Sequence, residues 1–339
     1  MKTRLRAVMS SGRMLTLTTV LSVALSGCSN DTESLNGFDD SPAANEEVPL
    51  QIAGGSISAD VQTRATTIRN GSIGIFRAAN NDYSALYNVQ YSYNGGWKVS
   101  SSEKTIYLSQ KNATLYAYYP YNSFSFTANS TKATLTAQKF VDAMDMCYAT
   151  SGGSNVCNKT PNATFAMNRA YSRIQLFIKR HATNYVGTGY VSNINFKNGS
   201  TFYYGCTLDI ATGTYGGTPK DGGWSYAFNT TIIASKTESA DLLVPPQPVG
   251  SGLTITLTLD GVNRSVTVPA GKFTSNSLVA GKIYKITLEI SAAQINIDGS
   301  VTGDDYGTQG NTDYELNIYA VTVDDYGSQE NADFETKAK

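Results

Sequence analysis

The chain has 339 residues, of which 16% are charged and 22 are tyrosine, and its formal net charge is −1. This neutral balance argues against a nucleic-acid-binding protein, because phosphate backbones are bound by a basic field. Little charge combined with abundant Tyr, Thr, Val, Ile and Gly favours strands and tight turns. The composition therefore predicts an all-β protein.

The N-terminus has the pattern of an export signal. Basic residues precede the apolar run Met14–Leu25, and Leu25-Ser26-Gly27-Cys28 follows. A basic leader, a short apolar core and small residues at the cut make a secretory signal peptide, too short to span a membrane as a helix. The ending resembles a bacterial lipobox, whose cysteine becomes the acylated (palmitate-bearing) mature N-terminus. Residues 1–28 are predicted to be a lipoprotein signal peptide with Cys28 as the lipidation site; the alternative is an ordinary signal peptide with an incidental cysteine.

The segment behind the cysteine is predicted to be a flexible leash. Ser29–Val48 is acidic, rich in Asn and Ser, and nearly free of large apolar residues. Such a segment cannot bury enough surface to offset its ordering entropy. Asp31 and Glu33 resemble the surface-export signals of some Gram-negative lipoproteins. We therefore expect the protein at the outer membrane or cell surface, attached through its lipid.

Strand patterns fill most of the remaining chain. Leu253–Leu259 alternates apolar residues with threonine, and Asp260-Gly261 joins it to Arg264–Val268 as a hairpin. No long segment has helical periodicity. About 270 residues remain after the leader and leash, which suggests two domains. We expect two tandem antiparallel β-sandwiches, at residues 65–164 and 165–300.

Catalytic constellations are absent from the sequence. His181 is the single histidine, so neither a His-based triad nor a multi-His metal site can be assembled. No GxSxG, HExxH, P-loop or GxGxxG motif occurs. The sequence predicts a protein that is not an enzyme and uses no cofactor.

Three cysteines remain beyond Cys28. Cys147 and Cys157 flank a Gly/Ser-rich loop that would let them meet. Outside the cytosol a disulfide there is one interpretation, and two small buried side chains are the other. Cys206 is left over and is expected to be buried.

The C-terminus contains an internal repeat. Val301–Glu315 and Val321–Glu335 match at ten of fifteen positions. Both acidic segments have the first-to-twelfth spacing of an EF-hand loop, but Tyr306, Thr308 and Gln309 occupy ligand or glycine positions in the first, so no metal site is predicted. Residues 301–339 are thus expected to form a duplicated strand followed by an acidic tail.

Six short motifs occur in order behind the lipobox. They are Thr63-Arg64-Ala65, Ser72–Phe76 (SIGIF), Ala117–Tyr121 (AYYPY), Ala166–Ile174 (AMNRAYSRI), Leu243–Gln247 (LVPPQ) and Gly281–Leu288 (GKIYKITL). Together they resemble the fimbrillins, subunits of type V pili. The chain departs from that pattern near its end, where Asp305-Tyr306-Gly307 stands in place of a Trp-Gly turn.

The resemblance implies an architecture and an assembly mechanism. Fimbrillins have two β-sandwiches with Greek-key-like (transthyretin-like) connections and are exported as lipoproteins. An Arg-specific protease cuts in the first strand region, and a strand from a neighbouring subunit fills the vacated groove. Residues 29–64 would then be a propeptide, with Val48–Val61 as the removable strand, Arg64 as the cleavage residue and Arg69 as the fallback. The alternative is that Arg64 lies uncut in an exposed linker.

The partners follow from this interpretation. They are other pilin subunits, the outer membrane, the protease, and an adhesion ligand that the sequence does not identify. Leu316, Ile318 and Ala320 alternate in a segment long enough to fill one groove, so they are candidate donor-strand residues. The same segment would equally serve as an edge strand of its own sheet.

Two other functions remain open at this stage. A tip adhesin of the same pilus would keep the fold, and so would a non-polymerising surface lipoprotein that binds carbohydrate or protein. For the latter, the aromatic residues of Tyr83–Tyr93 and Phe202–Tyr204 with Trp224 are candidates for stacking on sugars.

Overall fold

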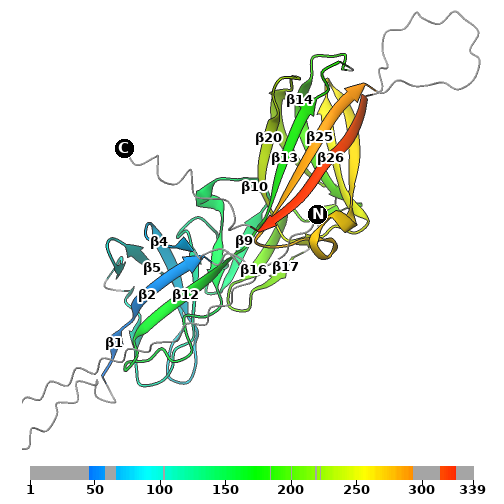
Figure 1. Ribbon diagram of the computed structural model, residues 1–339. Coiled ribbons are helices and arrows are strands. Elements are labelled where there is room, and N and C mark those ends of the chain that lie inside the picture. The colour runs from blue at the N-terminus through cyan, green and yellow to red at the C-terminus, as the bar shows by residue number, and fades with distance from the viewer. Residues whose placement is uncertain are drawn as a thin grey trace, which may run out of the picture. The chain divides into compact units, whose positions relative to one another are not determined.

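Strands make up nearly all the regular structure of this computed structural model (Figure 1). The structure describes residues 46–57, 66–101, 104–183, 185–199, 201–217, 220–221, 223–292 and 314–325. Within these ranges there is no α-helix, and short 3-10 turns occur at η2 (Asp142–Met144), η3 (Ala270–Lys272) and η4 (Thr274–Asn276). The predicted all-β class is confirmed.

The first sheet has eight strands in the order β3-β2-β12-β11-β8-β4-β5-β6. A short pair, β1 with β7, lies beside it. The bounds are β1 (Val48–Pro49), β2 (Gln51–Ile57), β3 (Thr66–Thr67), β4 (Ser72–Arg77), β5 (Leu86–Tyr93), β6 (Trp97–Val99), β7 (Tyr107–Leu108), β8 (Leu115–Tyr119), β11 (Cys147–Ala149) and β12 (Asn162–Arg169).

Two further sheets enclose a second core. A five-stranded sheet runs β10-β20-β13-β25-β26, and a six-stranded sheet runs β18-β15-β14-β22-β23 with β19 also paired to β14. The bounds are β10 (Gln138–Lys139), β13 (Ser172–Arg180), β14 (Tyr190–Asn198), β15 (Thr201–Phe202), β18 (Lys220–Asp221), β19 (Trp224–Thr231), β20 (Glu238–Val244), β22 (Gly252–Leu259), β23 (Val262–Pro269), β25 (Lys282–Ala292) and β26 (Tyr314–Asp325).

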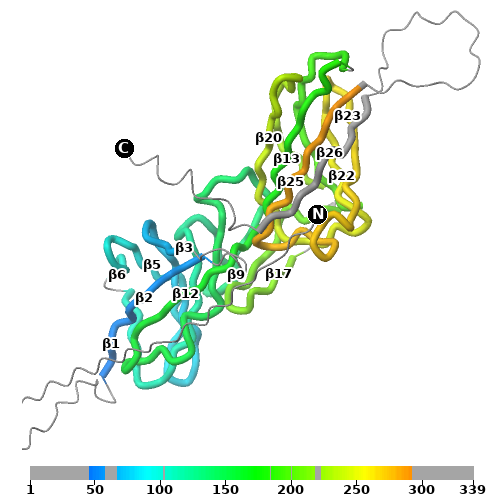
Figure 2. Tube along the Cα trace, in the orientation of Figure 1, coloured from blue at the N-terminus to red at the C-terminus, as the bar shows by residue number. Residues whose placement is uncertain are grey.

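A three-stranded sheet and a two-stranded pair complete the fold. β9 (Lys132–Thr136) pairs with β16 (Gly205–Asp209), which pairs with β17 (Thr214–Gly216), and β21 (Gln247–Pro248) pairs with β24 (Ser277–Leu278). A buried cluster joins this three-stranded sheet to residues of β4, β8, β20 and β25, among them Tyr118, Leu208 and Ile283. β12 runs across the predicted domain boundary at 164/165, and the chain continues from it into β13 (Figure 2). The domain division stays a prediction.

The apolar alternation of the sequence places the core residues. In β22 the apolar residues are buried and the threonines are half-buried, and Thr254 and Thr256 pair through their hydroxyls with residues of β23 at 2.9 and 2.7 Å. β22 and β23 form the predicted hairpin with Leu259 opposite Val262. Asp260 and Gly261 have φ values of 47° and 81°, the left-handed backbone that an Asp-Gly turn provides.

Most strand pairs are antiparallel, as predicted, but two are parallel. β2 runs parallel to β12, and β13 runs parallel to β25. The alternation of apolar residues shows which face of a strand is buried. It is the same for parallel and antiparallel pairing, so it does not define which strand is the partner or how that strand runs. β13 is an interior strand, with β20 on one side and β25 on the other, and it is buried or half-buried along its whole length, the usual setting of a parallel pair.

Asp260 fixes the loop that leads into β14. Its carboxylate accepts hydrogen bonds from the Tyr185 hydroxyl (2.6 Å), the Thr188 hydroxyl, and the backbone N–H groups of Gly189 (3.1 Å) and Tyr190 (2.9 Å). Burial alone raises the pKa of this carboxyl, but these hydrogen bonds outweigh burial and lower the pKa below its usual value.

Replacing Asp260 with asparagine is expected to lower the free energy of unfolding by about 1–2 kcal/mol at pH 7, since the charge is partly exposed. Asparagine tolerates the left-handed backbone, so the change removes mainly the charge. Because the folded-state pKa is lowered, the stabilisation is complete above the unfolded-state pKa of about 4 and is lost as the pH falls through the folded-state value. Urea unfolding of both proteins at pH 7 and pH 3 measures this; a stability gap of equal size at both pH values would contradict it.

Candidate functional site

The segment predicted to be removable is a strand inside the first sheet. β2 lies between β12, to which it is parallel, and the two-residue strand β3 (Figure 2). Phe165 of β12 is the partner of Gly55, and Met167 is the partner of Ile57. Loss of β2 would therefore leave one edge of β12 without a backbone partner and would separate β3 from the sheet.

Hydrogen bonds outside the regular ladder also hold this segment. The N–H of Leu50 donates to Ile106 O at 2.8 Å, and the N–H of Gln51 donates to Pro161 O at 2.9 Å. On the other side, the N–H of Ile68 donates to Gly55 O at 2.9 Å. The strand is thus attached on both edges, and an incoming strand would have to replace both sets of bonds.

Apolar side chains of the segment complete the core of the first sheet. Leu50 is 5% exposed, and Ile52 and Ile57 pack half-buried against the same cluster. Burial of such a side chain stabilises by about 1.5–3 kcal/mol. A groove vacated by β2 would expose Phe165 and Met167, which are fully buried, and an apolar strand edge of this kind binds another strand.

The two candidate cleavage residues lie in different positions relative to the core. Arg64 is outside the described residues, in the connection between the end of β2 at Ile57 and the start of β3 at Thr66. Arg69 is exposed and directly follows Ile68, which is 4% exposed. A cut after Arg64 leaves Ile68 on the chain, whereas a cut after Arg69 removes it. The predicted lipidation site, Cys28, is outside the described residues.

The candidate donor residues Leu316, Ile318 and Ala320 belong to β26. β26 pairs antiparallel with β25 of its own chain, and it is the edge strand of the five-stranded sheet. This is the edge-strand arrangement, the second of the two alternatives that the sequence left open. Use of the segment as a donor strand stays a prediction.

The three described cysteines are free thiols, so Cys147 and Cys157 are not bonded to each other. The Cys147 side chain is buried in the core of the first sheet, where burial raises its pKa to about 12. Cys157 lies half-buried in a bridge with Thr160. Cys147 thus matches the alternative of a small buried side chain, whereas Cys157 is only half-buried, and Cys206 is half-buried rather than buried.

Several aromatic side chains proposed for sugar stacking are used in packing. Tyr83 is buried, its hydroxyl donates to Lys111 O at 2.6 Å, and Arg77 lies over its ring. Trp224 stacks on Phe196 and Phe202, with ring centroids 5.7 and 6.5 Å apart. Tyr87, at 40% exposed, is one of the exposed large side chains of this region.

Two charged pairs, which the sequence patterns did not reveal, join neighbouring segments of the fold. Asp145, 5% exposed, pairs with Arg169 at the end of β12. Arg173, at the start of β13, donates through Nε to an Asp241 carboxylate oxygen at 2.6 Å, and its guanidinium carbon lies 3.6 Å from the centre of the Phe140 ring. Both arginines lie in the motif AMNRAYSRI, but their partners lie outside it, Asp145 in the loop before β11 and Asp241 in β20.

The remaining chemistry-bearing groups form no site in the described part of the chain. His181 is half-buried after β13, and its N–H donates to Ile290 O at 2.8 Å. No three His, Cys, Asp or Glu side chains among the described residues are placed to hold a metal ion. Of the helices in those residues, none is long and apolar enough to cross a membrane.

Comparisons with known proteins define the class. Residues 63–304 match the fimbrillin-like family, a family of structural fimbrial subunits. The match covers most of the chain, so the protein belongs to the fimbrillin-like family, and the resemblance carried by the six motifs is confirmed.

Solved structures support the same fold. A candidate cell adhesion protein from Bacteroides uniformis ATCC 8492 is 19% identical, with a TM-score of 0.52 over 83% of this chain and 99% of that chain. Another from Bacteroides ovatus ATCC 8483 is 14% identical, with a TM-score of 0.51 over 81% and 97%. The comparison with curated proteins gave no match.

Proposed function

We propose that the protein is a subunit of a type V pilus on the surface of a Gram-negative bacterium, assembled by protease-triggered strand exchange and serving adhesion. The observation that carries the proposal is the position of β2, which is paired on both edges and precedes an arginine-containing connection. A cut in that connection would free a strand whose place a second strand can take. Family membership supports the role of fimbrial subunit.

The maturation steps follow from the order of the segments. The precursor is exported and held at the outer membrane by acyl chains on Cys28. An Arg-specific protease cuts after Arg64, so the leash, the lipid and β2 leave together. The exposed edge of β12 then accepts a strand from a neighbouring subunit, with Leu316–Val323 as the candidate donor. Neither catalysis nor a cofactor is required.

Removing the C-terminal strand tests the proposal. Deleting Glu315–Lys339 is expected to abolish polymerisation after protease treatment while leaving a monomer that melts within about 5 °C of the full protein. β25 keeps β13 as its other partner, so the sheet persists without β26. Deleting only residues 326–339 leaves β26 complete and is expected to preserve polymerisation. Size-exclusion chromatography and thermal unfolding are the measurements.

A second function is favoured by one observation, the pairing of β26 with β25 in the same chain. In that case the protein is a non-polymerising surface lipoprotein that binds carbohydrate or protein. The deletion then gives a strongly destabilised monomer, and the full-length protein forms no polymer after cleavage.

A further inference from the structure

One place along β2 accepts only a small side chain. Gly55 is buried, and a Cβ atom added there would lie 3.6 Å from Ile68 Cδ1 and 3.7 Å from Trp97 Cζ2. These are ordinary van der Waals distances, so alanine fits. Any side chain with further carbon atoms would enter the volume held by the Trp97 ring and Ile68, because protein cores leave few voids.

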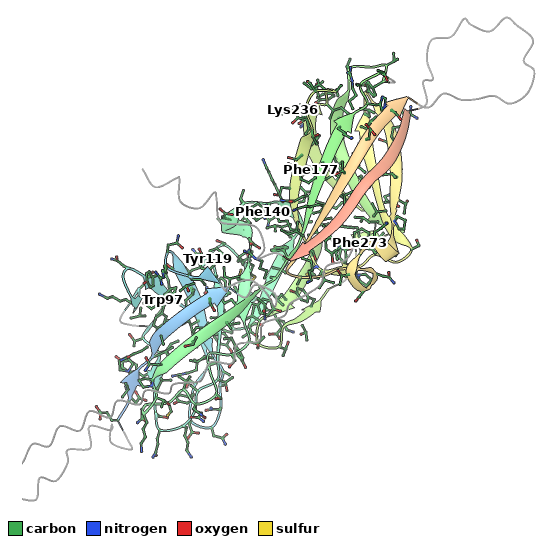
Figure 3. All side chains as sticks on the ribbon, viewed as in Figure 1. Trp97, Tyr119, Phe140, Phe177, Lys236 and Phe273 are labelled. Carbon is green, nitrogen blue, oxygen red and sulfur yellow. The ribbon has the colours of Figure 1, made fainter. Side chains whose placement is uncertain are left out.

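Of the two neighbours of Gly55, Trp97 is held in place by contacts outside β2. Trp97 (labelled in Figure 3) belongs to β6, at the far end of the same sheet; its ring packs on the first core and meets Tyr93 edge-on at 5.3 Å. Ile68 is 4% exposed, and its backbone N–H donates to Gly55 O, a bond that is lost with β2. A cut after Arg64 removes neither Trp97 nor Tyr93, so the Trp97 ring still limits side-chain size at this place after the loss of β2.

The segment around β2 therefore presents a definite order of side-chain sizes to the core. Leu50 and Ile52 come first, Gly55 follows, and Ile57 is last. The spacing lengthens between Ile52 and Gly55 because the register with β12 shifts there, leaving Ala53 exposed. The four places along the groove thus hold a large, a large, a small and a large side chain in this order.

We propose that this place selects the incoming strand by size, so that Leu316–Val323 of a second copy enters parallel to β12 with Ala320 beneath Trp97. The inference rests on the function proposed above. In a regular strand, Leu316, Ile318 and Ala320 take the places of Leu50, Ile52 and Gly55. Ala320 of the donor strand then occupies the place of Gly55, where only a small side chain fits.

Other parallel registers of the same segment put a larger residue at this place. A strand that copied the register shift of β2 would put Val321 beneath Trp97, and a parallel strand displaced by two residues would put Ile318 or Thr322 there. The size restriction therefore selects one register of the parallel strand, as pockets for alternate side chains do in strand addition.

Full-length variants treated with an Arg-specific protease test the inference. Ala320→Leu is expected to slow polymerisation about tenfold or more, since overpacking a core of this kind weakens binding by that order. Val321→Leu adds bulk at the neighbouring position and is expected to polymerise like the wild type. Combining Ala320→Leu with Trp97→Ala is expected to restore polymerisation, because the second change empties the space above the leucine.

The outcomes separate the inference from the function beneath it. A wild-type protein that is cut but does not polymerise overturns the proposed function. If the wild type polymerises and Ala320→Leu does so at the same rate, the size selection is wrong. The size selection is also wrong if the double variant still does not polymerise although thermal unfolding shows that Trp97→Ala is folded. The block caused by Ala320→Leu then arises elsewhere.

Discussion

The Arg64→Ala protein is expected to stay at the membrane as an unpolymerised precursor. Without the cut, the lipid on Cys28, the leash and β2 remain on the chain, and the edge of β12 stays paired along Asn162–Met167. Loss of polymer should be nearly complete, since one uncut bond keeps the groove filled. Membrane fractionation together with electron microscopy of surface extracts is the measurement.

Arg69→Ala is the matched control. The proposed cut is after Arg64, so we expect the Arg69→Ala variant to be processed and to assemble normally. A cut after Arg69 would also remove Ile68, a core residue that contacts the Gly55 position. If Arg64→Ala still yields soluble, lipid-free polymer while Arg69→Ala does not, then the cleavage residue is Arg69.

The Asp145→Ala protein is expected to lose about 3–5 kcal/mol of unfolding free energy. The change takes away the carboxylate that faces Arg169, whose side chain is only 20% exposed, and leaves a guanidinium charge in a largely buried place. The pair closes the end of β12, the strand that carries the groove. Chemical denaturation of the wild type and the variant measures the loss.

A double variant distinguishes the buried charge from lost packing. Asp145→Ala combined with Arg169→Met removes both charges and keeps a long apolar side chain at the second position. We expect it to recover more than half of the lost free energy, because the cost of the single variant comes mainly from a largely buried charge that has lost its carboxylate. A double variant as unstable as Asp145→Ala alone would contradict this explanation.

The sequence predicts the strands of this fold better than it predicts their partners. The alternation in Leu253–Leu259 and the turn Asp260-Gly261 were sufficient for the β22–β23 hairpin, because the pairing is local. The parallel pairing of β2 with β12 joins segments more than 100 residues apart. No local pattern contains that information, since side-chain alternation is the same in both directions.

The same limit applies to the candidate site. The apolar residues Leu50, Ile52 and Ile57 marked the removable segment in the sequence, and the structure places them in or against the first core. The tight place at Gly55 depends on Trp97, which reaches it from the opposite end of the sheet. A glycine in a strand indicates close approach of another group but does not identify that group.

N-terminal sequencing of the protein extracted from the cell surface tests the central claim most directly. The proposed maturation predicts a free N-terminus at Ala65, in a protein that carries no lipid and has lost β2. A blocked N-terminus at an acylated Cys28, on protein that is otherwise complete and monomeric, would contradict it.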